Sequence, residues 1–263
     1  MVIKNKFYIL VILALVNGCV GSGDGLSQST NDTKSVDKIT YLKQLAKGGD
    51  LDSMYNLGHL YYVDKDYQKA LEWFKLAAEQ GDTKAQDGLG HLYYNGWGVK
   101  KDYQKALEWY KLAAEQGDEY AQYYLGLMYV NGEGVKKDYQ KALEWFKFSA
   151  EQGYAYSQYG LGHLYYNGWG VKKDYQKALE WYILAAEQGL ADSQYNLGRM
   201  YYKGVGVKKD YKKAIQWYEA AILAGNIESQ YALALMYYNG EGIEQDQIKA
   251  LAMLHEAREQ KHQ

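Results

Sequence analysis

Apolar residues recur at helical intervals along most of the chain. Ala85, Leu89 and Leu92 are spaced by four and three residues, which places them on one face of an α-helix that we predict over residues 83–94. A second apolar set follows before Gly117 and comprises Ala106, Leu107, Trp109, Tyr110 and Ala113. This set predicts a second amphipathic helix that ends at about Gln116.

Glycine and aspartate mark the ends of these two helices. The segment Asn95-Gly96-Trp97-Gly98 should end the first helix, because glycine readily adopts the left-handed conformation found at helix ends. Asp102 should cap the second helix, since its short carboxylate can accept the free backbone N–H groups. The chain has 263 residues and no proline, so glycine supplies the helix stops.

The helix pair is repeated with a period of 36 residues. Five glycines stand at this spacing, namely Gly81, Gly117, Gly153, Gly189 and Gly225. Residues 91–117 match residues 163–189 except that Lys111 corresponds to Ile183, which indicates duplication of one module. We therefore expect six units, the first of them four residues shorter than the rest: 49–80, 81–116, 117–152, 153–188, 189–224 and 225–260.

A single helix pair cannot bury its apolar faces, so the units should stack against one another. Gly90 and Ala106 are small enough to let the two helices of a unit approach closely. Trp109 and its equivalents are expected to fill the gaps between units (Trp73, Trp145, Trp181 and Trp217). Residues 36–48 resemble the end of another second helix and should cap the first unit, and residues 261–263 are expected to form a short tail.

The repeated motifs resemble those of Sel1-like repeats. They comprise Ala-Gln-x-x-Leu-Gly-x-x-Tyr, then Asn-Gly-x-Gly-Val, then Asp-x-x-Lys-Ala, and finally Trp-(Tyr/Phe)-x-x-Ala-Ala-Glu-Gln-Gly. Sel1-like repeats are relatives of tetratricopeptide repeats with a longer loop between the helices. The resemblance extends over residues 49–260. It implies an all-α fold, a right-handed α/α solenoid of about six helix pairs that serves as a scaffold for protein binding.

The first nineteen residues resemble a bacterial lipoprotein signal. Lys4 and Lys6 precede an apolar run over residues 7–16. As a helix this run is about 15 Å long, half of the roughly 30 Å hydrocarbon core, so it suits a secretory signal rather than a membrane span. Val16-Asn17-Gly18-Cys19 follows, and the resemblance implies a signal peptide over residues 1–18 and lipidation of Cys19. The alternative is an ordinary cleaved signal in which the cysteine has no role.

Residues 19–35 are rich in glycine, serine, aspartate and threonine, and we expect them to form a flexible tether. Several acyl chains on one residue would hold the protein stably at a membrane. Val20 rather than aspartate follows the cysteine. By analogy with lipoproteins, this favours the outer membrane of the bacterial envelope, with the protein facing the periplasm.

Composition excludes several other classes. The chain has one cysteine, which by itself can form neither an intramolecular disulfide nor a zinc site. Aromatic residues make up 16% of the chain, including 30 tyrosines, and such a content argues against global disorder. The net charge of −2 gives no reason to expect a nucleic-acid partner. We predict no cofactor and no metal ion, and we expect a monomer.

The histidines and serines do not form a catalytic pattern. His91 and His163 occupy equivalent positions two units apart, which is too far for shared metal ligation when adjacent helix axes are about 8–10 Å apart. Ser157 shares its repeat position with Ala85 and Ala121, which indicates a small packing slot rather than a nucleophile. Gly96-Trp97-Gly98 follows no strand, so a phosphate-binding loop is not indicated.

A hydrolase is the alternative function. Some cysteine-rich Sel1-repeat proteins are described as penicillin-binding proteins with β-lactamase activity, and their repeats are linked by regularly placed cysteines. No cysteine follows Cys19 in this chain. The resemblance therefore transfers no β-lactam or cell-wall hydrolase site, and we predict that the protein is not an enzyme and has no catalytic residues.

One stripe of the first helix varies between units, whereas the core leucines do not. Three positions in each unit, spaced by three and four residues, share this helix face, and the family implies that first helices line a concave surface. Tyrosine suits binding because it offers a large contact area at modest entropic cost. The candidate partner-binding residues are Tyr120, Tyr123, Tyr156, Tyr159, Tyr195, Arg199, Tyr231, His91 and His163. The alternative for each tyrosine is packing between units.

These patterns predict an envelope-anchored scaffold that binds a protein or peptide partner in its concave surface. The family suggests two roles, an immunity protein that neutralises antibacterial effectors or an assembly factor for exported polymers. Besides the tyrosine stripe, lysine pairs such as Lys100-Lys101 recur in the loops between the two helices of a unit and form a second row. It either faces anionic headgroups or polysaccharide or forms an ordinary solvated edge.

Cys19→Ser should release the protein from membranes, because the side chain that would carry the acyl chains is lost. Fractionation of cells that express either form measures this effect. A Cys19→Ser protein that still partitions with membranes to the same extent would contradict lipidation at this residue.

Overall fold

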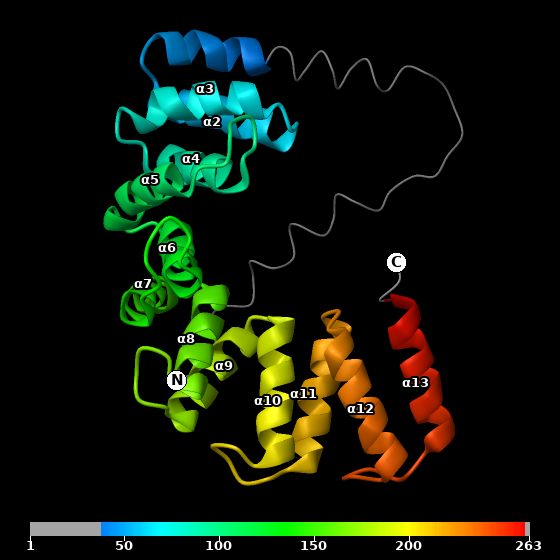
Figure 1. The fold of residues 1–263 in the computed structure, drawn as a ribbon. Coiled ribbons are helices and arrows are strands. Elements are labelled where there is room, and N and C mark those ends of the chain that lie inside the picture. The colour runs from blue at the N-terminus through cyan, green and yellow to red at the C-terminus, as the bar shows by residue number, and fades with distance from the viewer. Residues whose placement is uncertain (1–37, 261–263) are drawn as a thin grey trace, which may run out of the picture.

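The computed structural model describes residues 38–260, and every regular element in this range is helical (Figure 1). A helix over residues 38–47 comes first. Twelve further helices follow: α2 (Leu51–Val63), α3 (Tyr67–Ala78), α4 (Thr83–Asn95), α5 (Tyr103–Glu115), α6 (Glu119–Asn131), α7 (Tyr139–Glu151), α8 (Ala155–Asn167), α9 (Tyr175–Glu187), α10 (Ala191–Lys203), α11 (Tyr211–Leu223), α12 (Ile227–Asn239) and α13 (Gln247–Gln260). They form six consecutive pairs, so the predicted all-α solenoid of helix pairs is confirmed.

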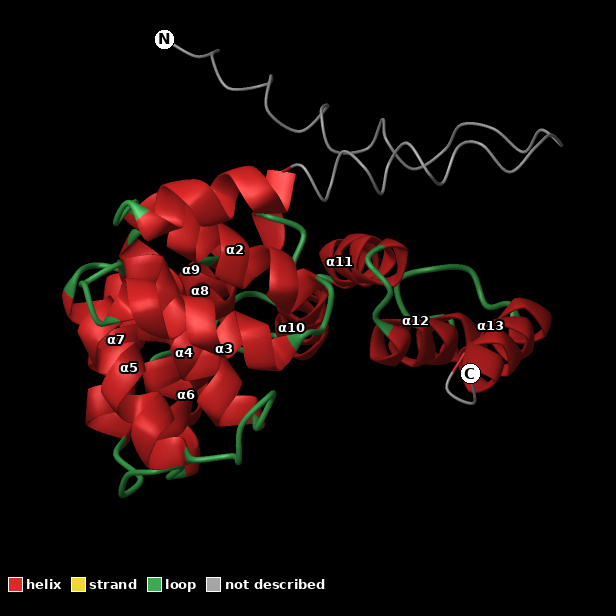
Figure 2. Ribbon diagram, turned by 90° about the horizontal axis from the view of Figure 1, so that it is seen from above, coloured by secondary structure: helices red, strands yellow, loops and turns green. Residues whose placement is uncertain are grey.

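The six pairs follow a curved path (Figure 1). Each helix packs mainly against the helices before and after it, and several first helices also contact each other across units, as α2 contacts α4 and α4 contacts α6. In Figure 1, α4 and α6 lie on the inner side of the curve relative to α5 and α7. Figure 2, seen from above, shows α11, α12 and α13 continuing the path beyond α10. The first helices therefore line the concave surface.

The helix ends lie where the glycines and aspartates predict them. Gly96 ends α4 with a left-handed φ of 76°. Asp102 caps α5 by accepting hydrogen bonds of 3.1 Å from the backbone N–H groups of Gln104 and Lys105. The same cap recurs at Asp138 and Asp174, so one local rule produces the second helix in successive units.

The two helices of a unit are held together by a contact between a glycine and an aromatic ring. A Cβ atom on Gly90 would lie 2.5 Å from the ring of Tyr110, far inside van der Waals contact. The first five units share this contact, as Gly58 with Phe74, Gly90 with Tyr110, Gly126 with Phe146, Gly162 with Tyr182 and Gly198 with Tyr218. In the last unit Ala234 replaces the glycine and Leu254 replaces the ring. The two positions therefore change together.

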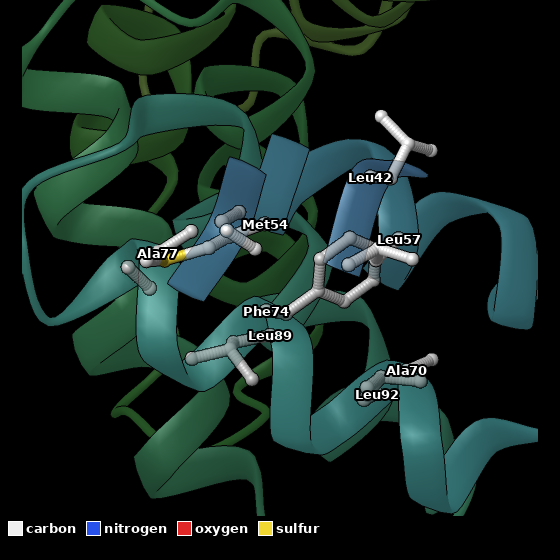
Figure 3. Close-up of a cluster of buried hydrophobic side chains, with 11 residues drawn as sticks. Leu42, Met54, Leu57, Ala70, Phe74, Ala77, Leu89 and Leu92 are labelled. Atoms are coloured by element: carbon white, nitrogen blue, oxygen red, sulfur yellow. The ribbon is translucent and has the colours of Figure 1, made fainter. Parts of the chain in front are cut away.

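These rings and the leucines of the first helices build the hydrophobic core. Figure 3 shows Phe74 among Met54, Leu57 and Leu89, which belong to one buried cluster. The leucine that does not vary between units is buried in all six first helices, at Leu57, Leu89, Leu125, Leu161, Leu197 and Leu233. The prediction that these leucines form the core is confirmed.

The tryptophans contact neighbouring units but are not the most deeply buried rings. Trp109 packs on the cluster around Phe74, and Trp145 packs on the cluster around Tyr110. Both tryptophans remain half-buried, whereas Tyr110 and Phe146 are at most 2% exposed. The predicted gap-filling role of tryptophan is thus confirmed in part. The residue that follows each tryptophan, Tyr110 or Phe146, faces the core and is the more deeply buried ring.

A buried glutamine joins each of the second to fifth units to the one before it. The Gln86 side-chain amide donates a 3.2 Å hydrogen bond to the carbonyl of Ala78, and Gln86 Oε1 accepts a 2.7 Å bond from Gln116. The same two bonds recur at Gln122 and Gln158. At the next unit Ala224 takes the place of the donor glutamine, and Gln194 Oε1 is left without a partner.

The N-terminal helix contributes to the first core cluster. Leu42 and Ala46 of the helix over residues 38–47 are buried against α2 and α3. The predicted signal peptide (1–18), the tether (19–35) with Cys19, and the tail (261–263) lie outside the described residues. In the described part of the chain, no helix combines the length and the apolar character that crossing a bilayer requires.

Gly90→Ala should lower the free energy of unfolding by about 1–3 kcal/mol, because the added methyl group overlaps the Tyr110 ring and forces the two helices apart. Urea unfolding followed by far-UV circular dichroism measures this change. Tyr110→Leu in the Gly90→Ala background reproduces the Ala234 and Leu254 pair of the last unit and should recover part of the lost stability. If Tyr110→Leu only adds to the loss, steric overlap is not its cause.

Candidate functional site

The predicted partner-binding residues lie on the first helices. Tyr120 and Tyr156 are the most exposed of the tyrosines among them, at 47% and 48%. The other predicted residues are half-buried, because the positions three and seven residues further along the helix lie closer to the core. This surface is therefore built largely from side chains that contact both the core and solvent.

Two cavities open between neighbouring first helices. The acidic cavity, of about 420 Å³, lies between α2, α4 and α6, and its polar lining comprises His59, Lys84, Asp87, His91, Asp118 and Glu119. The apolar cavity, of about 190 Å³, lies between α6 and α8 and is lined mainly by Tyr123, Leu127, Phe146, Tyr156, Tyr159 and His163.

The two cavities occupy equivalent positions two units apart. Each contains a glycine of a first helix that faces a phenylalanine of the preceding unit, Gly88 against Phe74 and Gly160 against Phe146. The other units carry larger residues at this position, namely Asn56, Tyr124, Asn196 and Ala232. The absence of a side chain at Gly88 and Gly160 thus leaves space that the other units fill.

A row of aromatic pairs connects this surface to the core. The Tyr159 ring centroid lies 5.9 Å from that of Tyr182. The same pair recurs in other units at 5.9–6.1 Å, as Tyr55 with Phe74, Tyr123 with Phe146 and Tyr195 with Tyr218. Tyr123, Tyr159 and Tyr195 therefore contribute to packing within their units, in addition to facing the concave surface.

Asp87 interrupts this row. It occupies the tyrosine position in the second unit, and Tyr124 of α6 stacks on Tyr110 instead, with ring centroids 5.2 Å apart and ring planes 8° apart. The Tyr110 hydroxyl and the Asp87 Oδ1 atom are both buried without a hydrogen-bond partner. Buried polar atoms normally find partners, so two unsatisfied groups lie at this interruption, and one of them, Asp87, lines the acidic cavity.

Burial governs the protonation of the groups in the acidic cavity. Burial, reinforced by the nearby Asp118 and Glu119 carboxylates, raises the pKa of Asp87 well above its usual value. Burial also lowers the pKa of His91 to about 4, so this imidazole is neutral at neutral pH. Asp87 Oδ2 lies 3.6 Å from His91 Nε2, which is longer than a normal hydrogen bond. The Asp87 carboxyl thus has no close polar partner.

Four tyrosines form a cluster between the two cavities. The Tyr154 ring centroid lies 5.0–5.6 Å from the centroids of Tyr120, Tyr123 and Tyr156. Tyr154 occupies the N-cap position of α8, at which the Asp118 side chain caps α6. Helix α8 has no side-chain cap hydrogen bond. At this position an aromatic surface has replaced a stabilising helix cap.

The cavities bring together six of the nine predicted partner-binding residues. His91 and Tyr120 line the acidic cavity, while Tyr123, Tyr156, Tyr159 and His163 line the apolar cavity. The remaining three line neither cavity. Arg199 lies over the Tyr195 ring, 5.5 Å from its centroid, and Tyr231 is half-buried on α12.

Sequence reasoning missed Asp118, Glu119 and Tyr154. Asp118 is hidden by its second role, because it accepts a 2.8 Å hydrogen bond from the backbone N–H of Ala121 as a helix cap. Tyr154 could have been found from the loss of the capping aspartate at its repeat position. A residue that gives up a local stabilising role is a candidate for a functional one.

The lysine row lies in the loops. The second lysine of each pair is exposed and lies over the ring of the tyrosine that begins the next second helix. These pairs are Lys101 with Tyr103, Lys137 with Tyr139, Lys173 with Tyr175 and Lys209 with Tyr211, at 5.4–5.8 Å from the ring centroids.

Other candidate chemistry is absent from the described part of the chain or is structural. No group of three or more His, Cys, Asp or Glu side chains within residues 38–260 is placed to hold a metal ion. Ser157 is fully buried, and its hydroxyl donates a 2.7 Å hydrogen bond to Ser149. This serine occupies a packing slot, as its exchange with alanine predicts.

Comparison with known proteins agrees with the repeat structure. A sequence profile described as Sel1 repeat matches residues 51–82, 83–118, 119–154, 155–190, 191–226 and 227–262. The chain is similar to c5321, a protective antigen of uropathogenic Escherichia coli strains that displays an SLR fold, with 42% identity and a TM-score of 0.80. The match covers 84% of this chain and 48% of that one, so the chain spans about half the length of the antigen.

A second solved structure matches over nearly its whole length. It is a Sel1 repeat protein from Oxalobacter formigenes with 33% identity and a TM-score of 0.76, and the match covers 88% of this chain and 98% of that one. A search of curated proteins found no match.

Leu190→Asp should raise the free energy of unfolding by about 1 kcal/mol, because an aspartate there would supply the side-chain cap that α10 lacks. Tyr154→Asp should gain less, since it also removes the ring contacts of the tyrosine cluster. Chemical unfolding of the two variants gives both values. Equal gains would mean that the cluster contributes no stability and that Tyr154 is free to be replaced.

Proposed function

The chain belongs to the Sel1 repeat family, and we propose that it is a non-enzymatic scaffold that binds a protein partner in its concave surface. The observation that carries this proposal is the tyrosine cluster of Tyr120, Tyr123, Tyr154 and Tyr156, flanked by two cavities. Aromatic side chains next to pockets are typical of the centres of protein interfaces.

The cluster is favourable for binding and unfavourable for the isolated chain. Tyr120 and Tyr156 expose nearly half of their surface, and Tyr154 stands where a helix cap would stabilise α8. Such an arrangement gains its stabilisation when a partner covers the rings. The two cavities draw on α2, α4, α6 and α8, so a ligand that fills both extends across several units, as a loop or segment of a protein would.

We propose that the partner is a protein that resides in the cell envelope or enters it. Either the chain is an immunity protein and the partner is an antibacterial effector, or it is an adaptor and the partner belongs to an assembly machinery for exported polymers. The two roles require different partners. Capture from envelope extracts with identification by mass spectrometry therefore distinguishes them.

We also propose that the protein is anchored to the envelope through Cys19, with the outer membrane as the expected site. The support is the lipoprotein-like segment Val16-Asn17-Gly18-Cys19 after a short apolar run. A tether over residues 19–35 would separate the repeats from the membrane by roughly 20–25 Å if it behaves as a flexible coil. That separation would leave the concave surface accessible to a partner in the same compartment.

Tyr120→Ala combined with Tyr156→Ala should abolish capture of the partner while the helix content and the unfolding midpoint stay close to those of the parent. These two tyrosines are chosen because they are the most exposed of the candidate tyrosines, whereas Tyr159 and Tyr195 pack on the core rings Tyr182 and Tyr218. The measurement is a pull-down from the native envelope with the parent and the variant side by side.

Phe148→Ala is the matched control. Phe148 is 52% exposed, but it lies on α7, a second helix outside the concave surface. This variant should retain the partner. Loss of capture by Phe148→Ala, or full capture by the double tyrosine variant, would place the interface elsewhere on the molecule.

A further inference from the structure

The acidic cavity differs from its apolar equivalent in the side chain that it can accept. We propose that the acidic cavity is a subsite for an arginine side chain of the protein partner, with Asp87 as its main anchor. This inference rests on the proposed function, since it names a chemical group of the partner that the concave surface would bind.

The two cavities share a shape but not a lining. Both lie over a glycine that faces a phenylalanine, Gly88 over Phe74 in the acidic cavity. The apolar cavity is lined at two further repeat positions by Tyr156 and Tyr159, and the acidic cavity carries Lys84 and Asp87 at those positions. At these two positions the apolar cavity therefore has aromatic side chains and the acidic cavity has charged ones.

The Asp87 carboxyl lacks the partners that a buried polar group requires. Its Oδ1 atom is buried without a hydrogen bond, and its Oδ2 atom lies 3.6 Å from His91 Nε2. An unsatisfied buried carboxyl is costly, because it has lost water without gaining a replacement. A donor group from outside the chain would supply what the fold does not.

The charges in the cavity favour a cation. Three carboxyl groups line it, those of Asp87, Asp118 and Glu119, against the single ammonium group of Lys84. The His91 imidazole opposes a cation little, since its low pKa keeps it neutral. A positive group that enters would also favour the ionised form of Asp87, whose pKa is raised by burial, and it would gain a charge-assisted hydrogen bond.

The aromatic walls suit a guanidinium group in particular. Tyr55, Tyr62, Phe74 and Tyr120 line the cavity, and Lys84 Nζ lies 5.7 Å from the centroid of the Tyr55 ring, so this wall already accepts a cation. Arginine stacks its planar group on aromatic rings and pairs its N–H groups with carboxylates at the same time. The ammonium group of lysine is more strongly hydrated and presents no flat face.

The test uses two short peptides that differ at one side chain. The full chain is titrated with acetyl-Gly-Arg-Gly-amide and with the same peptide in which citrulline replaces arginine, and binding is followed by NMR chemical-shift changes. The arginine peptide should shift the signals of Tyr55 and His91. The citrulline peptide has nearly the same shape but no charge, and it should bind at least about tenfold more weakly.

Two variants locate the effect. Asp87→Asn keeps the shape of the cavity and removes the carboxylate, and it should weaken binding of the arginine peptide by about tenfold or more. Glu228→Gln is the matched control, because it removes one exposed carboxylate from α12, outside the acidic cavity. It should leave binding unchanged. Circular dichroism of both variants verifies that the helices are intact.

Equal binding of the arginine and citrulline peptides, or unchanged binding to Asp87→Asn, would overturn the inference. So would shifts confined to residues outside the cavity. These outcomes are separable from failure of the proposed function. If the arginine peptide does not bind but the double tyrosine variant still loses the native partner, the subsite is wrong and the scaffold proposal stands.

Discussion

A glycine pressed against an aromatic ring sets the distance between the two helices of nearly every unit. The contact between Gly90 and Tyr110 leaves no room for even a methyl group, so the ring reaches the middle of the helix pair and is fully buried. The leucines of the first helices, the half-buried tryptophans and the glutamine bonds between units all depend on this spacing. In the last unit both positions differ together, because Ala234 replaces the glycine and Leu254 replaces the aromatic ring.

The residues of this contact hold the solenoid together. Other positions of the first helices vary between units and form the concave surface. Gly88 and Gly160 lie two residues before the core glycine of their helices and face the ring of the preceding unit. Their small size opens a cavity without disturbing the contact within the unit. The side chain at the repeat position of Asp87 and Tyr159 can therefore change from unit to unit while the spacing of the helices stays the same.

The fold could be predicted from local rules, and much of the surface could not. Asp102 caps its helix and Leu89 enters the core because of their own helical positions, which the sequence displays directly. The acidic cavity instead combines Asp87 with Asp118, residues from different units whose proximity depends on how first helices stack. The expectation that Trp109 fills the gap between units did not identify Tyr110 as the more deeply buried ring, since the composition of a helix face does not show which of two adjacent rings lies at its centre.

The interruption at Asp87 has a consequence at the level of the gene. Aspartate and tyrosine codons differ by a single base, so one point mutation can convert the tyrosine of the repeat into the carboxyl of the acidic cavity, or reverse the change. The neighbouring ring of Tyr124 already occupies the vacated position on Tyr110, which limits the cost of the exchange to the folded protein. Recognition in a solenoid of this kind can therefore diverge between duplicated units faster than its architecture does.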